Sequence, residues 1–226
     1  MYRNLFFDVD DTLLDFEAGE LASLKQTFAR QHIAYTPQLE ATYLKLNAAL
    51  WRRYERGEIS RQEIFAQRMP QTFTALHLAG DPLVAERDYF KLVNAQAVLL
   101  PGVGAMLQRL APYKLYIVSN GFEAAQRFRL QKSHLIDYFT DIFVSDTIGA
   151  PKPTTAFFAH VAAHIPDYDP ATSLIIGDSL TSDIQGGHNA HMDTAWFNPR
   201  RLPNPGAPKP TYTLTALSDL PKLLAV

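Results

Sequence analysis

The stretch Leu5-Phe6-Phe7-Asp8-Val9-Asp10-Asp11-Thr12 stands almost at the start of the chain and decides its fold class. Three apolar residues run directly into a cluster of acids, which is typical of a parallel-sheet strand that ends at a polar edge. Because successive side chains of a strand alternate between its faces, Asp8 and Asp10 can turn toward one place. The stretch therefore predicts a parallel sheet with an acidic site at its carboxyl edge.

Further apolar runs along the chain repeat this form. The strands that we expect after residue 100 cover residues 115–118, 142–144, 173–176 and about 193–197. Helical segments are expected after Pro101-Gly102-Val103, through Phe128 and Leu130, over 155–164 and over 183–190. Strands that alternate with helices predict an α/β fold with a doubly wound, Rossmann-like parallel sheet and right-handed crossovers. Such sheets bind ligands beyond the carboxyl ends of their strands.

Between residues 16 and 97 the apolar spacing changes to three and four residues, as in Leu21, Leu24 and Phe28. Helix-breaking residues interrupt this stretch near Thr36-Pro37, Gly57 and Gly80-Asp81-Pro82. We therefore expect a catalytic core of residues 1–15 and 98–226, interrupted by an all-helical cap domain of residues 16–97. The tail from 199 to 210 contains five prolines and predicts an extended loop.

The composition limits the possible partners and chemistry. The chain has 226 residues, a net charge of −2 and no cysteine, which excludes disulfides, thiolate metal sites and cysteine nucleophiles. Its net charge favours binding to neither a nucleic acid polymer nor a membrane. Binding of an anionic small molecule would need a local positive charge, such as a metal ion. No signal peptide or run of about 20 apolar residues is visible. We expect a cytoplasmic monomer or homodimer.

Four carboxylates fall at or just after predicted strand ends: Asp8, Asp10, Asp178 and Asp183. Adjacent carboxylates repel, and they persist together most cheaply around a hard cation such as Mg²⁺. Taken singly, Asp10, Asp11 and Asp183 could equally be helix caps or turn formers. Their joint occurrence at strand ends favours a metal site.

Two weaker motifs accompany these acids. Ser119-Asn120-Gly121 follows the second predicted strand, and its hydroxyl, amide and backbone N–H groups could hold phosphate oxygens, although the same tripeptide is a common turn. Lys152 lies between Pro151 and Pro153, which stiffen its backbone. Its ammonium group could neutralise a phosphoryl group in the transition state, or it could be an exposed loop lysine.

Together these motifs resemble the four motifs of the haloacid dehalogenase-like hydrolase superfamily, in its capped subgroup. They are, in order, Asp8-Val9-Asp10-Asp11-Thr12-Leu13, Ser119-Asn120-Gly121, Lys152-Pro153 and Gly177-Asp178-Ser179-Leu180-Thr181-Ser182-Asp183. The resemblance implies that Asp8 is the nucleophile, which forms an aspartyl-phosphate, and that Asp10 is the general acid and base. Ser119 and Lys152 would hold the phosphoryl group.

The same resemblance implies a Mg²⁺ cofactor. Asp8, the backbone carbonyl of Asp10 and Asp178 would bind the ion, and Asp183 would support the metal waters and Lys152. The chemistry is consistent with this assignment, because a carboxylate attacks without a base but needs a cation to screen its repulsion from phosphate. The leaving alkoxide needs a proton, which accounts for a second carboxyl group.

A narrower resemblance is to bacterial pyrimidine-preferring nucleoside 5′-monophosphate phosphatases. It rests on residues 10–16, where many relatives have glycine at position 11, on Trp196-Phe197-Asn198-Pro199 and on Pro210-Thr211-Tyr212. It implies a small phosphate ester, a nucleotide, as substrate. The candidate substrate-binding residues are Thr12, Asn120, Gly121, Phe16, Trp51 and Tyr54. Aromatic residues at helical spacing are usually core residues, so a core role for the three aromatics is favoured over a substrate contact. His188 and His191 are expected to be surface or packing residues.

Other functions remain open from the sequence. A phosphosugar or phosphoglycolate phosphatase or mutase would share the motif set. Dehalogenases fit less well because they lack a second acid like Asp10, and a phosphonate-cleaving enzyme would need an amine in the cap. A phosphoryl-acceptor module without turnover would share the sheet, the acids and the lysine, but not a large cap.

Overall fold

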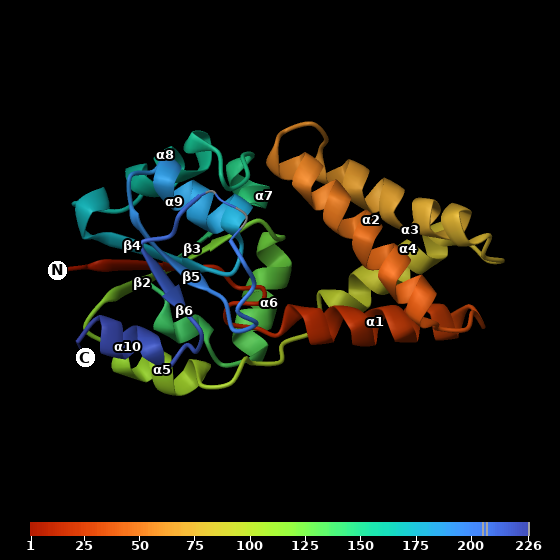
Figure 1. The fold of residues 1–226 in the computed structure, drawn as a ribbon, viewed down its shortest axis with the longest axis horizontal. Coiled ribbons are helices and arrows are strands. Elements are labelled where there is room, and N and C mark those ends of the chain that lie inside the picture. The colour runs from red at the N-terminus through yellow and green to blue at the C-terminus, as the bar shows by residue number, and fades with distance from the viewer. Residues whose placement is uncertain (205, 207, 226) are drawn as a thin grey trace. The chain divides into compact units, whose positions relative to one another are not determined.

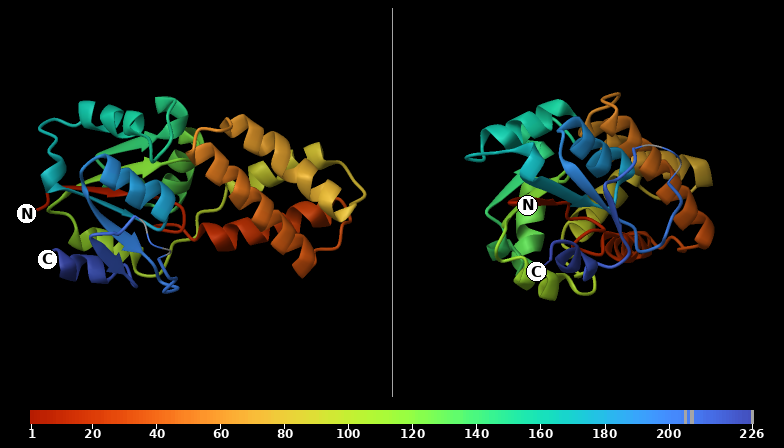
Figure 2. Two further views of the ribbon diagram at one scale, coloured as in Figure 1. Left: turned by 45° about the horizontal axis from the view of Figure 1, so that its top comes forward. Right: turned by 60° about the vertical axis from the view of Figure 1, so that its left-hand side comes forward.

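The computed structural model describes residues 1–204, 206 and 208–225. The chain forms two compact units, one of Met1–Asp15 with Ala97–Val226 and one of Phe16–Gln96. We call the first the sheet unit and the second the helical unit. Figures 1 and 2 show the strands gathered in the first and helices alone in the second.

The sheet unit is built on six parallel strands in the order β3-β2-β1-β4-β5-β6. Their bounds are β1 (Asn4–Phe7), β2 (Lys114–Ser119), β3 (Asp141–Val144), β4 (Ser173–Gly177), β5 (Asp193–Phe197) and β6 (Tyr212–Leu214). The predicted parallel α/β fold is confirmed. The chain adds β2 and β3 on one side of β1 and then returns to place β4 on the other side. The carboxyl ends of β1 and β4 therefore meet at the switch point where such sheets bind ligands.

Helices cover both faces of this sheet. Their bounds are α5 (Val103–Arg109), α6 (Glu123–Lys132), α7 (Ser145–Ile148), α8 (Thr155–Ala163), α9 (Gln185–Asn189) and α10 (Asp219–Leu223). Leu5 and Phe7 of β1 pack with α5, α6 and α10, while Phe6 packs with α8 on the opposite face. This alternation buries every side chain of β1, which is why its sequence is continuously apolar.

Two details of the sheet unit differ from the sequence-based expectation. Strand β6 was not predicted, because it has only three residues and follows a proline-rich stretch. The helix expected over 183–190 begins earlier, with a π-helical turn over Leu180–Ile184 that continues into α9. Of the proline-rich tail over 199–210, Pro205 and Ala207 lie outside the described residues, and the rest has no helix or strand.

The helical unit contains four helices: α1 (Phe16–Arg30), α2 (Pro37–Glu55), α3 (Arg61–Leu76) and α4 (Pro82–Val93). The predicted breaks at Thr36 and Asp81 are N-caps, since each side chain accepts backbone N–H groups of the first turn of α2 or α4. Ser60 and Glu63 form a capping box that starts α3. Phe28, Tyr43 and other buried residues of the four helices form this unit's own core.

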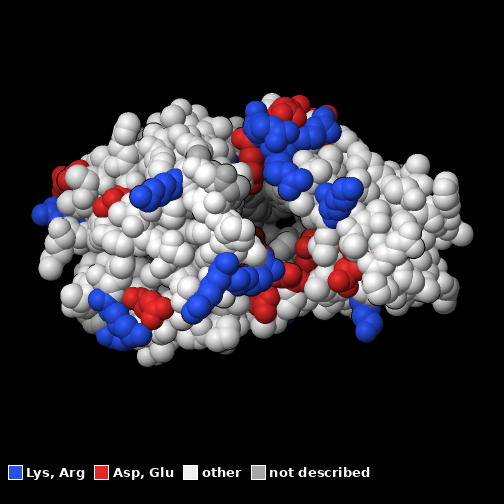
Figure 3. All heavy atoms as spheres, viewed as in Figure 1, with Lys and Arg blue, Asp and Glu red and all other residues white. Residues whose placement is uncertain are grey.

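The surface carries charge of both signs. On the face shown in Figure 3, Lys and Arg side chains occur close to Asp and Glu side chains, as the net charge of −2 leads one to expect. Among the described residues, no helix combines the length and apolarity that a membrane span requires.

Candidate functional site

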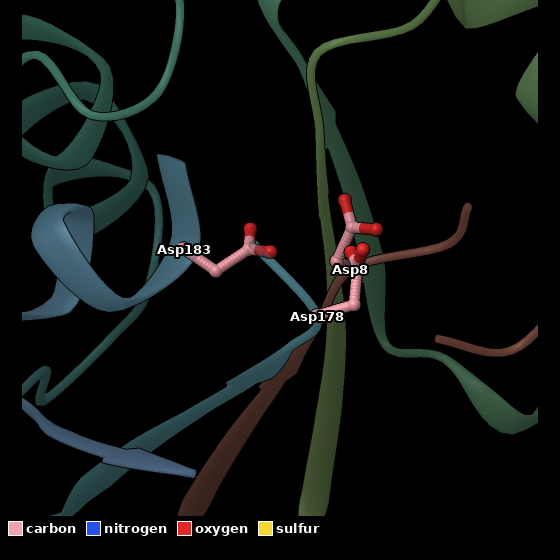
Figure 4. Close-up of side chains that lie close together, drawn as sticks. All are labelled: Asp8, Asp178 and Asp183. Carbon is pink, nitrogen blue, oxygen red and sulfur yellow. The ribbon is translucent and has the colours of Figure 1, made fainter. Parts of the chain in front are cut away.

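Three carboxylates meet at the carboxyl edge of the sheet unit. Asp8 directly follows β1, Asp178 directly follows β4, and Asp183 lies in the π-helical turn after β4. Each offers one oxygen, and these oxygens all lie within 4.8 Å of one another. Figure 4 shows the Asp8 and Asp178 carboxylates close together, with that of Asp183 pointing toward them from its turn. Residues 170 positions apart in the sequence thus form one cluster because β1 and β4 are neighbours.

Lys152 is the cation of this cluster. Its side chain is only 1% exposed, and its Nζ donates to Asp8 Oδ1 at 2.7 Å, to Asp183 Oδ1 at 2.6 Å and to the Val118 carbonyl at 2.8 Å. An ammonium group has three donors, and all three are engaged. Lys152 therefore holds the two carboxylates in place, and its predicted direct contact with a phosphoryl group stays a prediction.

Asn120 fixes the backbone of Lys152. Its Nδ2 donates to the Lys152 carbonyl at 3.0 Å, and its Oδ1 accepts the Lys152 N–H at 2.8 Å. This pair of hydrogen bonds joins the second and third sequence motifs and sets the direction of the lysine side chain. The side chain of Asn120 is thus used within the protein, and its predicted contact with substrate stays a prediction.

The charges of this cluster fit a divalent cation. Burial raises the pKa of Asp8 to about 8, with Asp183 and Asp10 adding to the increase and Lys152 opposing it. Burial also raises the pKa of Asp178 well above its ordinary value. Although burial lowers it, the pKa of Lys152 is raised overall by Asp183 and Asp8. One ammonium faces three carboxylates, so two negative charges lack a partner when all are ionised, and oxygen ligands of this kind suit Mg²⁺.

Asp183 is placed by its own turn. Its Oδ2 accepts the backbone N–H of Ser179 at 3.1 Å, while its Oδ1 accepts from Lys152. The carboxylate lies directly against the Cα of Gly177, where a Cβ atom would overlap it. Glycine at the end of β4 is therefore required for the close approach of Asp183 to the strand.

Gly177→Ala is accordingly expected to displace the Asp183 carboxylate and to weaken its bond to Lys152. Because the overlap falls on a buried carboxylate, we expect a loss of about 1–3 kcal/mol in the free energy of unfolding. Urea unfolding followed by circular dichroism measures it. Gly104→Ala is the matched control, since a Cβ there has nothing within 4 Å. Equal stability of the Gly177 variant and the wild type would contradict the assignment.

Ser119 and Asp10 share a partner that sequence reasoning missed. Ser119 Oγ accepts the Gly121 N–H at 3.1 Å and the Gln126 amide at 2.9 Å, which leaves the serine proton available to a ligand oxygen. The same amide nitrogen donates to Asp10 Oδ2 at 2.9 Å, and Asp10 also pairs with Arg129. The signal in the sequence was a glutamine and an arginine three residues apart on the buried side of a predicted helix.

Trp196 is a second residue whose role was missed. Its indole Nε1–H donates to the Asp178 carbonyl at 2.7 Å. Trp196 lies on β5, next to β4, so this bond holds the loop that carries Asp178 against the neighbouring strand. In the sequence, Trp196 is informative only as part of the resemblance to the pyrimidine-preferring subgroup.

The remaining predicted residues lie in two kinds of environment. Thr12 is fully buried, and its hydroxyl has no hydrogen-bond partner within the described part of the chain. Phe16, Trp51 and Tyr54 pack into apolar clusters of the helical unit, and the last two make an edge-to-face contact. Their predicted substrate contacts stay predictions. Asp11 has a φ of 55°, a conformation that Asp tolerates and Gly favours.

His188 and His191 are both exposed in the structure. Neither belongs to the acidic cluster at the carboxyl edge of the sheet. The sequence predicts that they are surface or packing residues, and the structure places both at the surface.

Comparison with known proteins finds relatives whose sequences match along the whole chain. The Bacillus subtilis protein YfnB, described as a HAD-hydrolase, is 38% identical over 226 residues, which span 100% of this chain and 96% of YfnB. Its crystal structure bound to magnesium matches with a TM-score of 0.94, over 100% of this chain and 99% of that one.

Two further relatives are described as pyrimidine 5′-nucleotidases. PynA of Streptococcus pneumoniae is 37% identical over 222 residues, covering 97% of this chain and 93% of PynA. YjjG of Escherichia coli is 30% identical over 224 residues, covering 97% of this chain and 96% of YjjG. The model of the haloacid dehalogenase-like hydrolases matches residues 2–191. With its motif residues gathered at the switch point of the sheet, the chain belongs to the haloacid dehalogenase-like hydrolase family of enzymes.

Proposed function

We propose that this protein is a Mg²⁺-dependent phosphatase that acts on pyrimidine nucleoside 5′-monophosphates through an aspartyl-phosphate on Asp8. The observation that carries the proposal is the arrangement around Asp8. Its carboxylate lies at the end of β1, is held by Lys152 at 2.7 Å and shares a cluster with Asp178 and Asp183. Such a carboxylate can attack phosphorus, provided that the negative charge around it is balanced.

In the first half of the reaction, an Asp8 oxygen attacks the phosphorus atom, and the bond between phosphorus and the ester oxygen breaks. The carboxyl group of Asp10 gives its proton to that oxygen, so the nucleoside leaves as an alcohol. Ser119 donates a hydrogen bond to a phosphoryl oxygen. Its Oγ already accepts two hydrogen bonds within the protein, so its O–H remains available for this contact. Lys152 keeps Asp8 in line throughout.

In the second half, the Asp10 carboxylate takes a proton from a water molecule. The water oxygen bonds to phosphorus, the bond to Asp8 breaks, and inorganic phosphate is released. Asp8, Asp178 and the backbone carbonyl of Asp10 would hold Mg²⁺, which when bound screens the repulsion between Asp8 and the phosphoryl group. The description of YfnB as magnesium-bound supports this choice of ion.

The nucleotide part of the proposal is supported by the descriptions of PynA and YjjG. It is tested by measuring phosphate release from uridine and thymidine 5′-monophosphates, adenosine 5′-monophosphate, phosphoglycolate and glucose 6-phosphate. We expect the highest kcat/KM for the pyrimidine nucleotides, and release only when Mg²⁺ is present. A higher kcat/KM for phosphoglycolate or the sugar phosphate would overturn the nucleotide assignment but not the chemistry. Absence of release from every compound would overturn both.

Binding of Mg²⁺ is expected to depend on pH. Because the pKa of Asp8 is raised from 3.8 to about 8, the folded protein keeps a proton that the unfolded chain loses between about pH 4 and pH 8. Without metal, this group therefore makes the protein less stable as the pH rises through that range. Mg²⁺ must displace the proton, so its affinity weakens as the pH falls below about 8.

Thermal unfolding with Mg²⁺ and with EDTA measures this dependence. At a Mg²⁺ concentration 100 times its Kd, stabilisation is about 2.7 kcal/mol. For a chain of this size that corresponds to a rise in Tm of roughly 5–10 °C. We expect a rise of this order at pH 8.5 and a much smaller one at pH 5.5 for the same Mg²⁺ concentration. Equal shifts at the two pH values would contradict the assignment of Asp8 as a ligand.

A further inference from the structure

Helix α6 buries two polar side chains on the side that faces the site. Gln126 is 1% exposed and Arg129 is 2% exposed, and they lie one helical turn apart. Burial of an amide and a guanidinium is costly unless both are paired. Their partners therefore show what this face of α6 is built to hold.

Both side chains contact the carboxylate of Asp10, each at a different oxygen. Arg129 Nη1 lies 2.5 Å from Asp10 Oδ1, and Gln126 Nε2 donates to Asp10 Oδ2 at 2.9 Å. Arg129 Nη1 also donates to Gln126 Oε1 at 3.2 Å. A guanidinium has donors only, so it fixes the glutamine oxygen on its own side and turns the amide nitrogen toward Asp10.

The same amide nitrogen ties Asp10 to the second motif. Gln126 Nε2 donates to Ser119 Oγ at 2.9 Å as well as to Asp10. Gly121 leaves room for it, because a Cβ atom at that position would lie 2.5 Å from Gln126 Nε2. One buried glutamine thus sets the positions of an acid on β1's loop and a hydroxyl at the end of β2.

We propose that Gln126 and Arg129 are positioning residues that hold the Asp10 carboxyl group in the place from which it transfers protons. The inference rests on the proposed function, in which Asp10 is the general acid and base. Neither residue is assigned a contact with the substrate, and both act through the carboxyl group of Asp10. They act by restricting the rotamers of Asp10, which is less buried than its two partners, with 30% of its side chain exposed. Misplacement of a reacting group by about 1 Å can cost a factor of 100 in rate.

A purely structural role predicts a different outcome, and the leaving group separates the two. The value of kcat/KM reports the steps up to the transfer of phosphoryl to Asp8. In that step 4-nitrophenolate leaves as a stable anion and needs no proton, whereas phenolate is more basic and benefits from one. Loss of Asp10 positioning should therefore lower kcat/KM for phenyl phosphate much more than for 4-nitrophenyl phosphate. Loss of folded protein lowers both alike.

The variants are Gln126→Met, which keeps the length of the side chain and removes its donors, and Arg129→Met, which removes the guanidinium group and shortens the side chain. For both we expect kcat/KM with phenyl phosphate to fall about tenfold or more, within the range that general acid catalysis supplies. With 4-nitrophenyl phosphate kcat/KM should change less than about twofold for Arg129→Met. Gln126→Met also loses the hydrogen bond to Ser119, so it should lower kcat/KM for this ester too, but less than for phenyl phosphate. Arg129→Lys keeps a charged donor group, so it should retain part of the kcat/KM for phenyl phosphate that Arg129→Met loses. It also replaces Arg129→Met if that variant does not fold. Arg127→Met, on the same helix but 43% exposed, is the matched control.

The Asp10→Asn variant makes the outcomes distinguishable. If Asp10→Asn loses activity selectively with phenyl phosphate, the role of Asp10 is supported. If the Gln126 and Arg129 variants then lose activity equally with both esters, or not at all, this inference alone is overturned. If the wild-type enzyme released no phosphate from either ester, or if Asp10→Asn showed no selectivity, the role of Asp10 in the proposed function would fall and the inference with it.

Discussion

Asp8→Asn is expected to lower the rate of phosphate release by about 10⁴-fold or more, the scale seen when a nucleophile is removed from an enzyme. The amide oxygen of asparagine still accepts a hydrogen bond from Lys152, but the amide is a poor nucleophile and a poor ligand for Mg²⁺. Phosphate release with a saturating substrate and Mg²⁺ measures the effect. Turnover within about tenfold of the wild type would exclude Asp8 as the nucleophile.

The same variant should not unfold the protein. Because ionisation of the buried Asp8 opposes folding as the pH rises to about 8, its removal is expected to leave Tm in EDTA at pH 8.5 unchanged or higher. The Tm gain from Mg²⁺ should shrink. Asp137→Asn is the control, since Asp137 is exposed and lies outside the acidic cluster. A marked fall in the Tm of Asp8→Asn would mean that loss of activity reports loss of structure.

Lys152→Met is expected to have the largest effect on stability. It removes the single ammonium bonded to Asp8 and Asp183, and it leaves two buried carboxylates and the partly buried one of Asp178 within 4.8 Å of one another. Removing one partner of a buried ion pair costs about 3–5 kcal/mol. We expect a loss of that size in the free energy of unfolding at pH 8.5 in EDTA, measured by urea unfolding, together with loss of activity.

The pH dependence of this loss identifies its cause. Burial raises the pKa of Asp8 and of Asp178, so these two acids take up protons more readily at pH 5.5 and the destabilisation should be smaller than at pH 8.5. Lys222→Met is the matched control, because Lys222 is 68% exposed and pairs only with its helix neighbour Asp219 among the interactions described. If the loss of unfolding free energy is the same at both pH values, its cause is the lost packing of the lysine side chain and not the lost charge.

Local signals in the sequence were sufficient for the strands that carry the motifs. Phe6 and Phe7 are apolar because both faces of β1 are buried, and the polar residues that follow mark the point where the strand leaves the sheet. Thr36 and Asp81 marked helix starts because their side chains cap backbone N–H groups three or fewer residues away. In each case the partner is close in sequence, so the pattern is readable without the fold.

Strand β6 and the π-helical turn show where such signals end. Tyr212–Leu214 is a strand because it pairs with β5, and three residues after a proline-rich stretch carry too little periodicity to reveal this. Asp183 lies in a π-helical turn because its carboxylate bonds to Ser179 and Lys152 while resting against Gly177. Those bonds depend on neighbours that the spacing does not identify.

The sequence by itself determined the parallel α/β fold, the helical insertion and the identity of the acids at the strand ends, since periodicity and short motifs are local properties. The tertiary structure decided the partners. Asn120 is a candidate for substrate binding, and the fold shows that its side chain also holds the backbone of Lys152. Gln126 and Arg129 carry no motif in the sequence, and the fold places both against Asp10. A long polar side chain can reach many acceptors, and only the packing of α6 against the sheet selects one.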